Sequence, residues 1–507
     1  MRGVVAAGHP LTAEAGADVL RAGGNAVDAA VAAVLMSFVA ESPLTGPGAG
    51  GFMVVHTPGE SHVLDFFVAA PGLGLEGREP AALVPIDVRF SEDAVQRFNV
   101  GPASCGAFGT TLGLAETLRR FGTLGLAELT AAPARAAREG VRVVPMQAFL
   151  FEVLRPILTS TPECSAIYAP EGELLAENDT IRLPELGDLL DRLGAEGPAF
   201  LYSGDVAHAV SDWVLERGGT LSRDDLGSYE VIEREPARVT YRGREVLTNP
   251  PPSSGGILIA DALGILERLD EPHDAYVIAE VVESTNRARD EEFLQGLATE
   301  GFLEQFLAKQ ALDTVATEVR SRLGNTTHIS VMDAEGSCAS VTCSNGSCSG
   351  VVVPGTGMHL NNMLGEQDLN PLGFHRHAPG ARVPSMMAPT VVLSDAGEPE
   401  IAIGSAGSNR IRSAILQTVL HVVDEGMAAQ DAVSAPRLHV EQGQVDAEPG
   451  VDTAALDRLE QTGWTVRRWS ELNLFFGGVQ AVARNPDTGR LTGGGDPRRG
   501  GVATVVD

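Results

Sequence analysis

The seven residues from Asn325 to Val331, NTTHISV, hold the pattern in this sequence that most directly implies chemistry. A threonine hydroxyl is a weak nucleophile at neutral pH, but a threonine at a chain N-terminus has a base beside it in its own α-amine. Thr326 is internal, so this chemistry requires autoproteolysis: Thr326 attacks the Asn325 carbonyl, the acyl group moves to oxygen, and water hydrolyses the ester. The sequence therefore predicts a large segment, 1–325, and a small segment, 326–507, released by this cut.

The residues around Thr326 predict the elements that position it. A charged, helical run from Ala311 to Leu323 comes before it, and strand character begins at Thr327. The run from Val331 to Thr342 has an acidic, glycine-containing centre, which predicts a β-hairpin. Such a hairpin returns Thr342 and Ser344 to the side of Thr326.

Helical and strand patterns alternate along the rest of the chain, which predicts a layered α/β fold. The clearest helical patterns are Ala29 to Ala40, Ala115 to Phe121 and Ala260 to Leu269, and the clearest strand patterns are Arg238 to Leu247 and Ala388 to Leu393. With 507 residues, 44% of them hydrophobic, the chain can fill a large core, and we expect one intimate domain.

The charge balance excludes some classes of partner. There are 67 acidic and 37 basic residues, a net charge of −30, which repels nucleic acid and anionic membrane surfaces. The longest apolar run, Ala29 to Ala40, is too short to cross a bilayer, and the first ten residues lack a signal-peptide core. Five cysteines without a CxxC pair fit reduced thiols. We expect a cytoplasmic enzyme with no nucleic-acid or membrane partner.

Several ordered motifs together resemble the γ-glutamyltransferase family of N-terminal-nucleophile hydrolases along the whole chain. They are GGNAVDAA from Gly23, PLTGPGAGGF from Pro43, PARAAREG from Pro133, NPPPSSGG from Asn249 and DPRR from Asp496. The resemblance implies a four-layer αββα sandwich, a small-molecule substrate and no cofactor. It also implies that segments 1–325 and 326–507 form a heterodimer, intertwined as one domain; a higher oligomer is left open.

The resemblance assigns the catalytic parts residue by residue. Thr326 falls on the nucleophile, and Ser344 falls on a family threonine whose hydroxyl bonds it, a role that serine can keep. The loop from Gly404 to Arg410 is similar to the family's oxyanion segment, with Gly407 and Ser408 at its centre. Backbone N–H groups stabilise the oxyanion there, so Ser408 in place of glycine is compatible with the role.

The substrate-binding positions depart from the family pattern. Phe67 stands where an arginine clamps the α-carboxylate of the γ-glutamyl group; Gly346, with Asn345 beside it, stands for an asparagine; Glu366 stands for the amine-binding aspartate; and Ser385 and Met386 stand for paired serines. Leaving a buried charge without its partner costs about 2–5 kcal/mol. We therefore expect poor γ-glutamyl transfer, unless Arg376 or Arg382 fills the space of the missing clamp.

These departures lead to a main hypothesis and several alternatives. The main one is a retained catalytic apparatus with a re-purposed pocket for a non-glutamyl molecule, as in the family branch that cleaves a carbon–carbon bond in specialised metabolism of alkylproline units. The alternatives are an amide hydrolase similar to the cephalosporin and glutaryl acylases, and a true γ-glutamyl hydrolase or transferase. An unprocessed, non-catalytic scaffold is the alternative from another class.

Other reactive residue types have structural interpretations. His375 and His377 lie in a loop rich in glycine and proline without the further ligands that a metal requires, so no metal site is predicted. His328 is expected to be a structural hydrogen-bonding residue, and Asp28 and Asp65 are expected to be structural.

Overall fold

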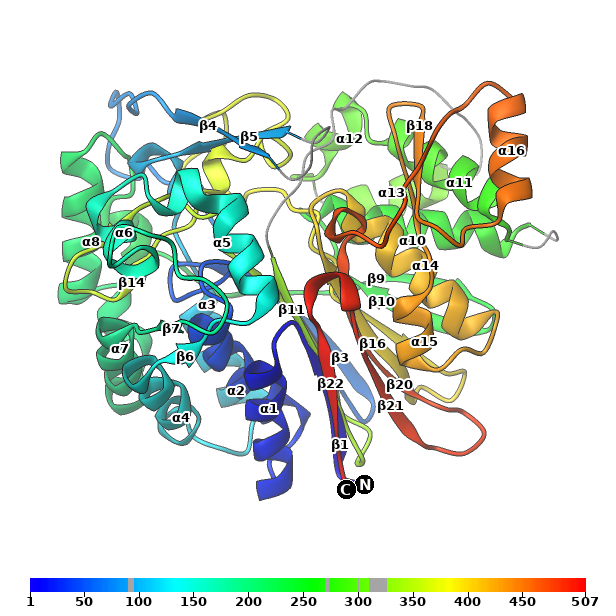
Figure 1. Ribbon diagram of the computed structural model, residues 1–507, viewed down its shortest axis with the longest axis horizontal. Helices are drawn as coiled ribbons and strands as arrows, with labels where there is room; N and C mark the ends of the chain where they lie inside the picture. The colour runs from blue at the N-terminus through cyan, green and yellow to red at the C-terminus, as the bar shows by residue number, and fades with distance from the viewer. Residues whose placement is uncertain (90–94, 270–272, 300, 310–325) are drawn as a thin grey trace.

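Two β-sheets packed face to face form the centre of the molecule, and helices cover the outer face of each sheet (Figure 1). The computed structural model describes residues 1–89, 95–269, 273–299, 301–309 and 326–507. The arrangement is the four-layer αββα sandwich that the resemblance implied.

The first sheet has seven strands. In spatial order they are β22 (Val502–Val506), β1 (Gly3–Ala7), β11 (Thr327–Asp333), β12 (Cys338–Ser344), β2 (Gly50–Thr57), β3 (Glu60–Phe66) and β8 (Ile232–Arg234). Neighbouring strands are antiparallel throughout. The termini therefore lie side by side, because β1 pairs with β22 (Figure 1).

The second sheet has six strands and packs on the inner face of the first. In order they are β21 (Leu491–Gly495), β20 (Gly478–Arg484), β16 (Pro399–Ala406), β15 (Thr390–Leu393), β10 (Arg244–Thr248) and β9 (Ala237–Tyr241). The contact between the sheets is filled by small and branched apolar side chains, among them Val4, Val54, Val391 and Val482. Along β1 the side chains alternate: Val4 and Ala6 face the other sheet, while Val5 and Ala7 face the helices.

Helices cover both outer faces. The first sheet is covered by α1 (Pro10–Ala22), α2 (Ala26–Ala40) and α3 (Thr110–Phe121), and α4 (Leu126–Glu139) and α7 (Pro184–Glu196) lie outside these helices. The second sheet is covered by α10 (Ser254–Glu267), α14 (Arg410–Val423) and α15 (Ala429–Ser434), and α11 (Ala275–Ala288) lies beside α10. Every residue of α2 is buried, which explains why its sequence is apolar on all sides. Its start is set by the reciprocal side-chain bonds of Asn25 and Asp28 with each other's backbone N–H.

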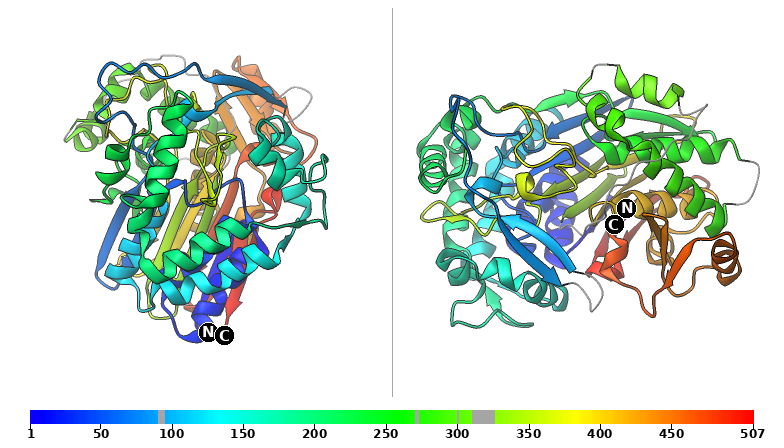
Figure 2. Two further views of the ribbon diagram at one scale, coloured as in Figure 1. Left: turned by 90° about the vertical axis from the view of Figure 1, so that its left-hand side faces the viewer. Right: turned by 90° about the horizontal axis from the view of Figure 1, so that it is seen from above.

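The remaining elements are short or peripheral. They are β4 (Val84–Arg89), β5 (Val95–Val100), β6 (Val141–Arg142), β7 (Thr180–Ile181), β13 (Val352–Val353), β14 (Met358–His359), β17 (Leu438–Glu441), β18 (Gln444–Ala447) and β19 (Thr465–Arg468), and α5 (Pro145–Leu158), α6 (Pro162–Tyr168), α8 (Asp205–Glu216), α9 (Arg223–Gly227), α12 (Glu291–Gly296), α13 (Phe302–Lys309) and α16 (Thr453–Gln461). Figure 2 shows the two sheets from the side and from above, enclosed by these elements.

The hairpin predicted after Thr326 is confirmed as β11 and β12, which pair in antiparallel register. The predicted strand from Arg238 to Leu247 is in fact two strands, β9 and β10, because Arg242 and Gly243 make a tight turn with positive φ. The strand predicted from Ala388 begins at Thr390, and the predicted helix from Ala260 is the second half of α10. The predicted helix from Ala311 to Leu323 lies outside the described residues.

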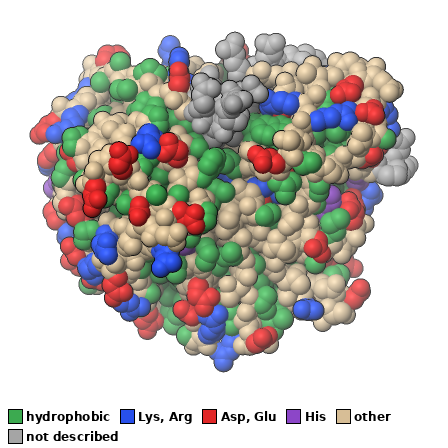
Figure 3. Space-filling view, viewed as in Figure 1, with side chains coloured by type: hydrophobic (Ala, Val, Ile, Leu, Met, Phe, Trp, Pro, Cys, Tyr) green, Lys and Arg blue, Asp and Glu red, His purple; other side chains and the backbone are tan. Residues whose placement is uncertain are grey.

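The surface carries acidic and basic side chains in mixture, and Figure 3 shows this on one face. None of the helices in the described ranges is long and apolar enough to span a membrane. The cytoplasmic location stays a prediction.

Candidate functional site

Thr326 directly precedes β11 and lies where this end of the first sheet borders a pocket. Its side chain is on the face of the strand that looks toward the second sheet, and the residue is 8% exposed. The Thr326 hydroxyl donates to Ser344 Oγ at 3.4 Å, across the end of the hairpin. The register that pairs Thr327 with Cys343 brings the two hydroxyls together.

His328 is a buried structural residue. Ser330 Oγ donates to the Gln480 carbonyl, so Ser330 Oγ accepts from His328 Nε2 at 2.9 Å, and His328 Nδ1 accepts from Thr342 Oγ1 at 2.8 Å. Burial lowers the pKa of His328 to about 3, so the ring stays neutral. Both ring nitrogens are occupied within the sheets, which agrees with the interpretation made from the sequence.

Glu41 lies just beyond α2, on the opposite face of β11. Its carboxylate accepts from Thr327 Oγ1 at 3.0 Å and from Thr12 Oγ1 at 2.7 Å. Burial raises the pKa of Glu41 to about 7, against the effect of these two hydroxyl donors. The residue after Thr326 is thereby held to the helical layer.

A pocket at Thr326, which we call the Phe67 pocket, brings together most of the residues predicted to bind substrate. Its lining comprises Phe67, Thr326, Ser344, Gly346, Met363, Glu366, Leu369, Ser385, Met386, Met387, Ser408 and Ile411. These residues come from segments far apart in the sequence. Among the described lining residues, Glu366 is the single charged side chain.

Phe67 is held in place from three sides at the end of β3. Its ring stacks on Phe52 with centroids 5.2 Å apart, and its carbonyl accepts from the Tyr229 hydroxyl at 2.6 Å. Its N–H donates to Asp65 at 2.9 Å, and Asp65 is fully buried and paired with Arg234 and Arg382. Asp65 is therefore structural, as predicted, and its role is to fix the strand that presents Phe67.

Glu366 is buried at the other side of the pocket. The Ser347 N–H donates to Glu366 Oε1 at 2.8 Å. Burial is nevertheless the larger influence and raises the pKa of Glu366 to about 8. A positively charged group bound beside it would favour the carboxylate, so this position is suited to an ammonium or another cation.

Two further pairs of residues were predicted to bind substrate, Ser385 with Met386 and Asn345 with Gly346, and the structure places them differently. Ser385 and Met386 line the pocket on a loop that is tied to α10, because the Ser254 N–H donates to the Ser385 carbonyl at 2.8 Å. A Cβ on Gly255 would lie 2.1 Å from the Met386 carbonyl oxygen, so the NPPPSSGG motif positions this loop. Asn345 instead turns its amide toward the Pro43 carbonyl at 3.5 Å, and Gly346 takes the lining position.

The predicted oxyanion segment, Gly404 to Arg410, runs from the last three residues of β16 to the first residue of α14. Gly407 and Ser408 both have positive φ, 125° and 50°, a conformation that is uncommon for serine. Ser408 lines the pocket with Thr326, and the N-terminus of α14 follows directly. The helix dipole favours negative charge at this end, as an oxyanion site requires.

The two arginines considered as substitutes for the missing clamp lie elsewhere. Arg382 pairs with Asp65 at 3.2 Å and lies over the Tyr229 ring at 4.4 Å. The Arg376 side chain packs beside Gly373. Asn325, the predicted site of cleavage, lies outside the described residues.

Sequence reasoning missed three contributors to the site. Glu41 and Met363 lie outside the motifs that carry the resemblance, and Arg499 is the last residue of the DPRR motif. The DPRR motif marks the segment that holds Arg499, but only the structure shows that Asp496 and Arg498 are buried in ion pairs with other residues. Across the described ranges, no group of three or more His, Cys, Asp or Glu side chains forms a metal site.

Comparison with known proteins agrees with this geometry. The family model described as gamma-glutamyltranspeptidase matches residues 12–506. The acylase ACY 1 proenzyme of Pseudomonas sp. strain SE83 is 32% identical over 100% of this chain and 94% of that protein, and the glutathione hydrolase proenzyme of Bacillus subtilis strain 168 is 30% identical over 100% and 92%. The crystal structure of cephalosporin acylase from Bacillus halodurans superposes with a TM-score of 0.82 at 25% identity, over 100% of this chain and 96% of that one. The chain thus belongs to the γ-glutamyltranspeptidase family and is an enzyme of the N-terminal-nucleophile hydrolase type.

Proposed function

We propose that this enzyme processes itself between Asn325 and Thr326 and then uses Thr326 to form an acyl-enzyme with a small molecule. The α-amine of Thr326 takes the hydroxyl proton as the oxygen attacks the substrate carbonyl. Backbone N–H groups at Gly407 and Ser408 stabilise the oxyanion. The leaving group departs with the proton, and water hydrolyses the ester. The observation that carries the proposal is the meeting of Thr326, Ser344 and Ser408 in one pocket.

Cleavage would leave two segments that stay associated. Strands β11 and β12 of segment 326–507 lie between β1 and β2 of segment 1–325 in the first sheet. The second sheet mixes the segments as well, because β9 and β10 come from the large one. This interleaving supports a heterodimer that remains one domain, and both relatives named above are called proenzymes.

The acyl group accepted by the Phe67 pocket is proposed to carry a cation and no α-carboxylate. Phe67 stands at the position of the clamp, and Arg382 is committed to Asp65. A γ-glutamyl carboxylate would lie near the acidic Glu366 without an ionic partner, at a cost of about 2–5 kcal/mol. An ammonium beside Glu366, on a chain that contacts Met363 and Met386, fits the lining better.

The bond cleaved is proposed to be an amide, as the names of the two acylase relatives suggest. Carbon–carbon bond cleavage in specialised metabolism is the second candidate. The observation that favours it is the aromatic wall at Phe67 in place of an amino-acid clamp, which suits a small apolar intermediate. An amide releases an amine, whereas the second reaction releases a stabilised carbon leaving group, so product masses distinguish them.

The test combines processing with acyl specificity on one sample. Intact mass of the purified protein should show segments 1–325 and 326–507, and the Thr326→Ala variant should stay whole. The processed enzyme should then hydrolyse 4-aminobutyryl anilide, which lacks the α-carboxylate, at least about tenfold better than γ-glutamyl anilide. An uncut wild-type chain would overturn the threonine mechanism, and a preference for γ-glutamyl would overturn the pocket assignment.

A further inference from the structure

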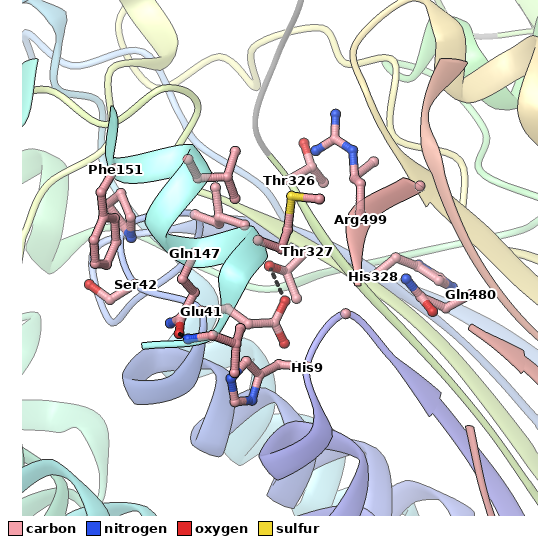
Figure 4. A pocket seen from close by; sticks show the side chains of 18 residues that line it. His9, Glu41, Ser42, Gln147, Phe151, Thr326, Thr327, His328, Gln480 and Arg499 are labelled. Atoms are coloured by element: carbon pink, nitrogen blue, oxygen red, sulfur yellow. Dashed lines mark hydrogen bonds between the residues drawn. The ribbon is translucent and has the colours of Figure 1, made fainter. Parts of the chain in front are cut away.

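A second cavity touches Thr326, and among the described residues it shares no other lining residue with the Phe67 pocket. We call it the Glu41 cavity, because Glu41 lines it together with Thr326. Figure 4 shows the Glu41 side chain between Thr327 and His9, with the hydrogen bond from Thr327 drawn as a dashed line. Its volume of about 40 Å³ has room for about three water molecules. A space of this size suits water better than a substrate group.

The Glu41 carboxylate is oriented by one hydroxyl donor on each oxygen. Thr12 Oγ1 donates to Oε1 at 2.7 Å, and Thr327 Oγ1 donates to Oε2 at 3.0 Å. A carboxylate offers about four acceptor positions, so each oxygen keeps one for a further donor. Gly8 also lines the cavity and leaves the approach to Oε2 open, because a Cβ there would lie 2.6 Å from that oxygen. Glu41 can therefore accept a proton from a molecule in the cavity.

Two buried polar atoms on the lining have no hydrogen-bond partner among the residues that the structure describes. The Leu11 N–H donates to His9 Nδ1 at 3.1 Å, so the ring proton of His9 is on Nε2, and this donor is unused. The side-chain amide oxygen of Gln480 is an unused acceptor. His9 is 3% exposed and Gln480 is 2% exposed, so both atoms face the interior. Water in the cavity would accept from His9 and donate to Gln480 and Glu41, within the about two to four hydrogen bonds that a buried water makes.

Glu41 is the ionisable side chain on the described lining that changes charge near neutral pH. Burial raises the pKa of Glu41 to about 7. Burial lowers the pKa of His9 to about 4 and that of His328 to about 3, so both rings are neutral, and it leaves Arg499 a cation with a pKa of about 10. The α-amine that an acyl shift releases on Thr326 titrates near pH ~8 and is mostly ammonium at neutral pH. Glu41 is thus the base available to a water in the cavity.

We propose that Glu41 is the proton acceptor for the water that hydrolyses the Asn325–Thr326 ester during autoproteolysis, and that the Glu41 cavity holds this water. The inference rests on the proposed function and assigns its hydrolytic step. The water oxygen bonds to the Asn325 carbonyl carbon while Glu41 takes one of the water protons. The bond from that carbon to Thr326 Oγ1 breaks, and this oxygen takes a proton from the Thr326 ammonium. Glu41 then releases its proton to solvent, and Thr326 is left with a free hydroxyl and a free amine.

The first test separates the two steps of autoproteolysis by trapping the ester. Freshly purified chains are incubated with and without hydroxylamine, which cleaves an ester under conditions that leave amides intact, and segment release is followed by intact mass. Glu41→Gln should slow release about a hundredfold, the usual size of a lost general base. Hydroxylamine should restore release in this variant and leave a hydroxamate on Asn325. Thr326→Ala should stay whole in both conditions, and the exposed control Glu76→Gln should process as wild type does.

The outcomes distinguish this inference from the proposed function. A wild-type chain that stays whole with and without hydroxylamine overturns both. If wild type is cut and Glu41→Gln is cut at the same rate, the proposed function stands and the role of Glu41 is overturned. A Glu41→Gln chain that stays whole even with hydroxylamine assigns Glu41 to the acyl shift or to folding, and this too overturns the hydrolytic role.

The second test uses readouts that a structural role would not move. The wild-type release rate should rise as pH rises through about 7 and then level off, because only the ionised Glu41 carboxylate accepts a proton. This rise should be absent in Glu41→Gln. Gly8→Ala keeps the carboxylate but covers Oε2 with its Cβ, so it should slow release and accumulate the hydroxylamine-sensitive ester. The same pH profile in wild type and Glu41→Gln, or release at the wild-type rate in Gly8→Ala, would overturn the site.

Discussion

The hydroxyls of Thr326 and Ser344 lie 3.4 Å apart at the open end of the β11–β12 hairpin, where the Thr326 hydroxyl donates to Ser344 Oγ. The contact depends on antiparallel register, since a slip of one residue would turn Ser344 to the helical face of the sheet. The Gly346 N–H donates to the same Ser344 oxygen at 2.9 Å, which also orients it. The Thr326–Ser344 pair lies at the end of the hairpin and lines the Phe67 pocket.

Ser344→Ala should slow both autoproteolysis and turnover. Removing one hydrogen bond of this kind costs about 0.5–1.5 kcal/mol, which is about two- to twelvefold in rate. The half-time of segment release by intact mass and kcat on the anilide measure the two effects. Ser344→Thr should restore both, because it returns the hydroxyl; equal rates for Ser344→Ala and wild type would remove Ser344 from the mechanism.

Phe67→Arg should move specificity toward γ-glutamyl substrates. A guanidinium at this position would pair with the α-carboxylate and recover part of the about 2–5 kcal/mol that the missing clamp costs. The readout is the ratio of kcat/KM for γ-glutamyl anilide to that for 4-aminobutyryl anilide, which should rise at least about tenfold. Phe67→Leu is the matched control, since it removes the stack on Phe52 without adding charge. A folded, processed Phe67→Arg protein with an unchanged ratio would speak against the assignment.

Glu366 should give recognition of cationic acyl groups a pH dependence. Its pKa is raised to about 8 by burial, so the free enzyme holds it mostly neutral below pH 8 and ionised above. The ratio of kcat/KM for 4-aminobutyryl anilide to that for pentanoyl anilide should therefore rise with pH and level off above about 8. Because both substrates depend on the Thr326 amine, the ratio to the uncharged pentanoyl isostere removes the effect of that amine, which titrates in the same pH range. A ratio independent of pH, or one that persists in Glu366→Gln, would contradict the role.

Glu41 should make stability fall as pH rises. Its folded pKa of about 7 exceeds the unfolded value of about 4.3, so the folded state binds the extra proton between these values. The contribution is fully present below pH about 4 and is lost as pH rises through 7, a change of about 4 kcal/mol in the free energy of unfolding. Glu41→Gln should gain stability relative to wild type over this range, measured by urea unfolding at several pH values. The exposed variant Glu76→Gln should show no such trend.

The sequence by itself determined the family, the sandwich and the order of the elements, because ordered motifs and periodic apolar patterns are local signals. The position of Thr326 just before a strand, and of Ser344 at the end of its hairpin partner, could be read from alternation and a turn. The absence of the family's arginine at Phe67 and of its second serine at Met386 could also be read from the sequence, since each is a change of residue type at a position that the resemblance assigns.

Tertiary structure alone decided which of these residues meet. Phe67 and Glu366 are 299 positions apart and face one pocket because β3 and the segment after β14 converge on Thr326. Asn345 and Gly346 are neighbours in sequence, yet one turns to Pro43 and the other lines the pocket. The unpaired Nε and NH1 donors of Arg499, among the residues that the structure describes, had no sequence signature either, because a buried group lacks a partner only when the fold places its neighbours elsewhere.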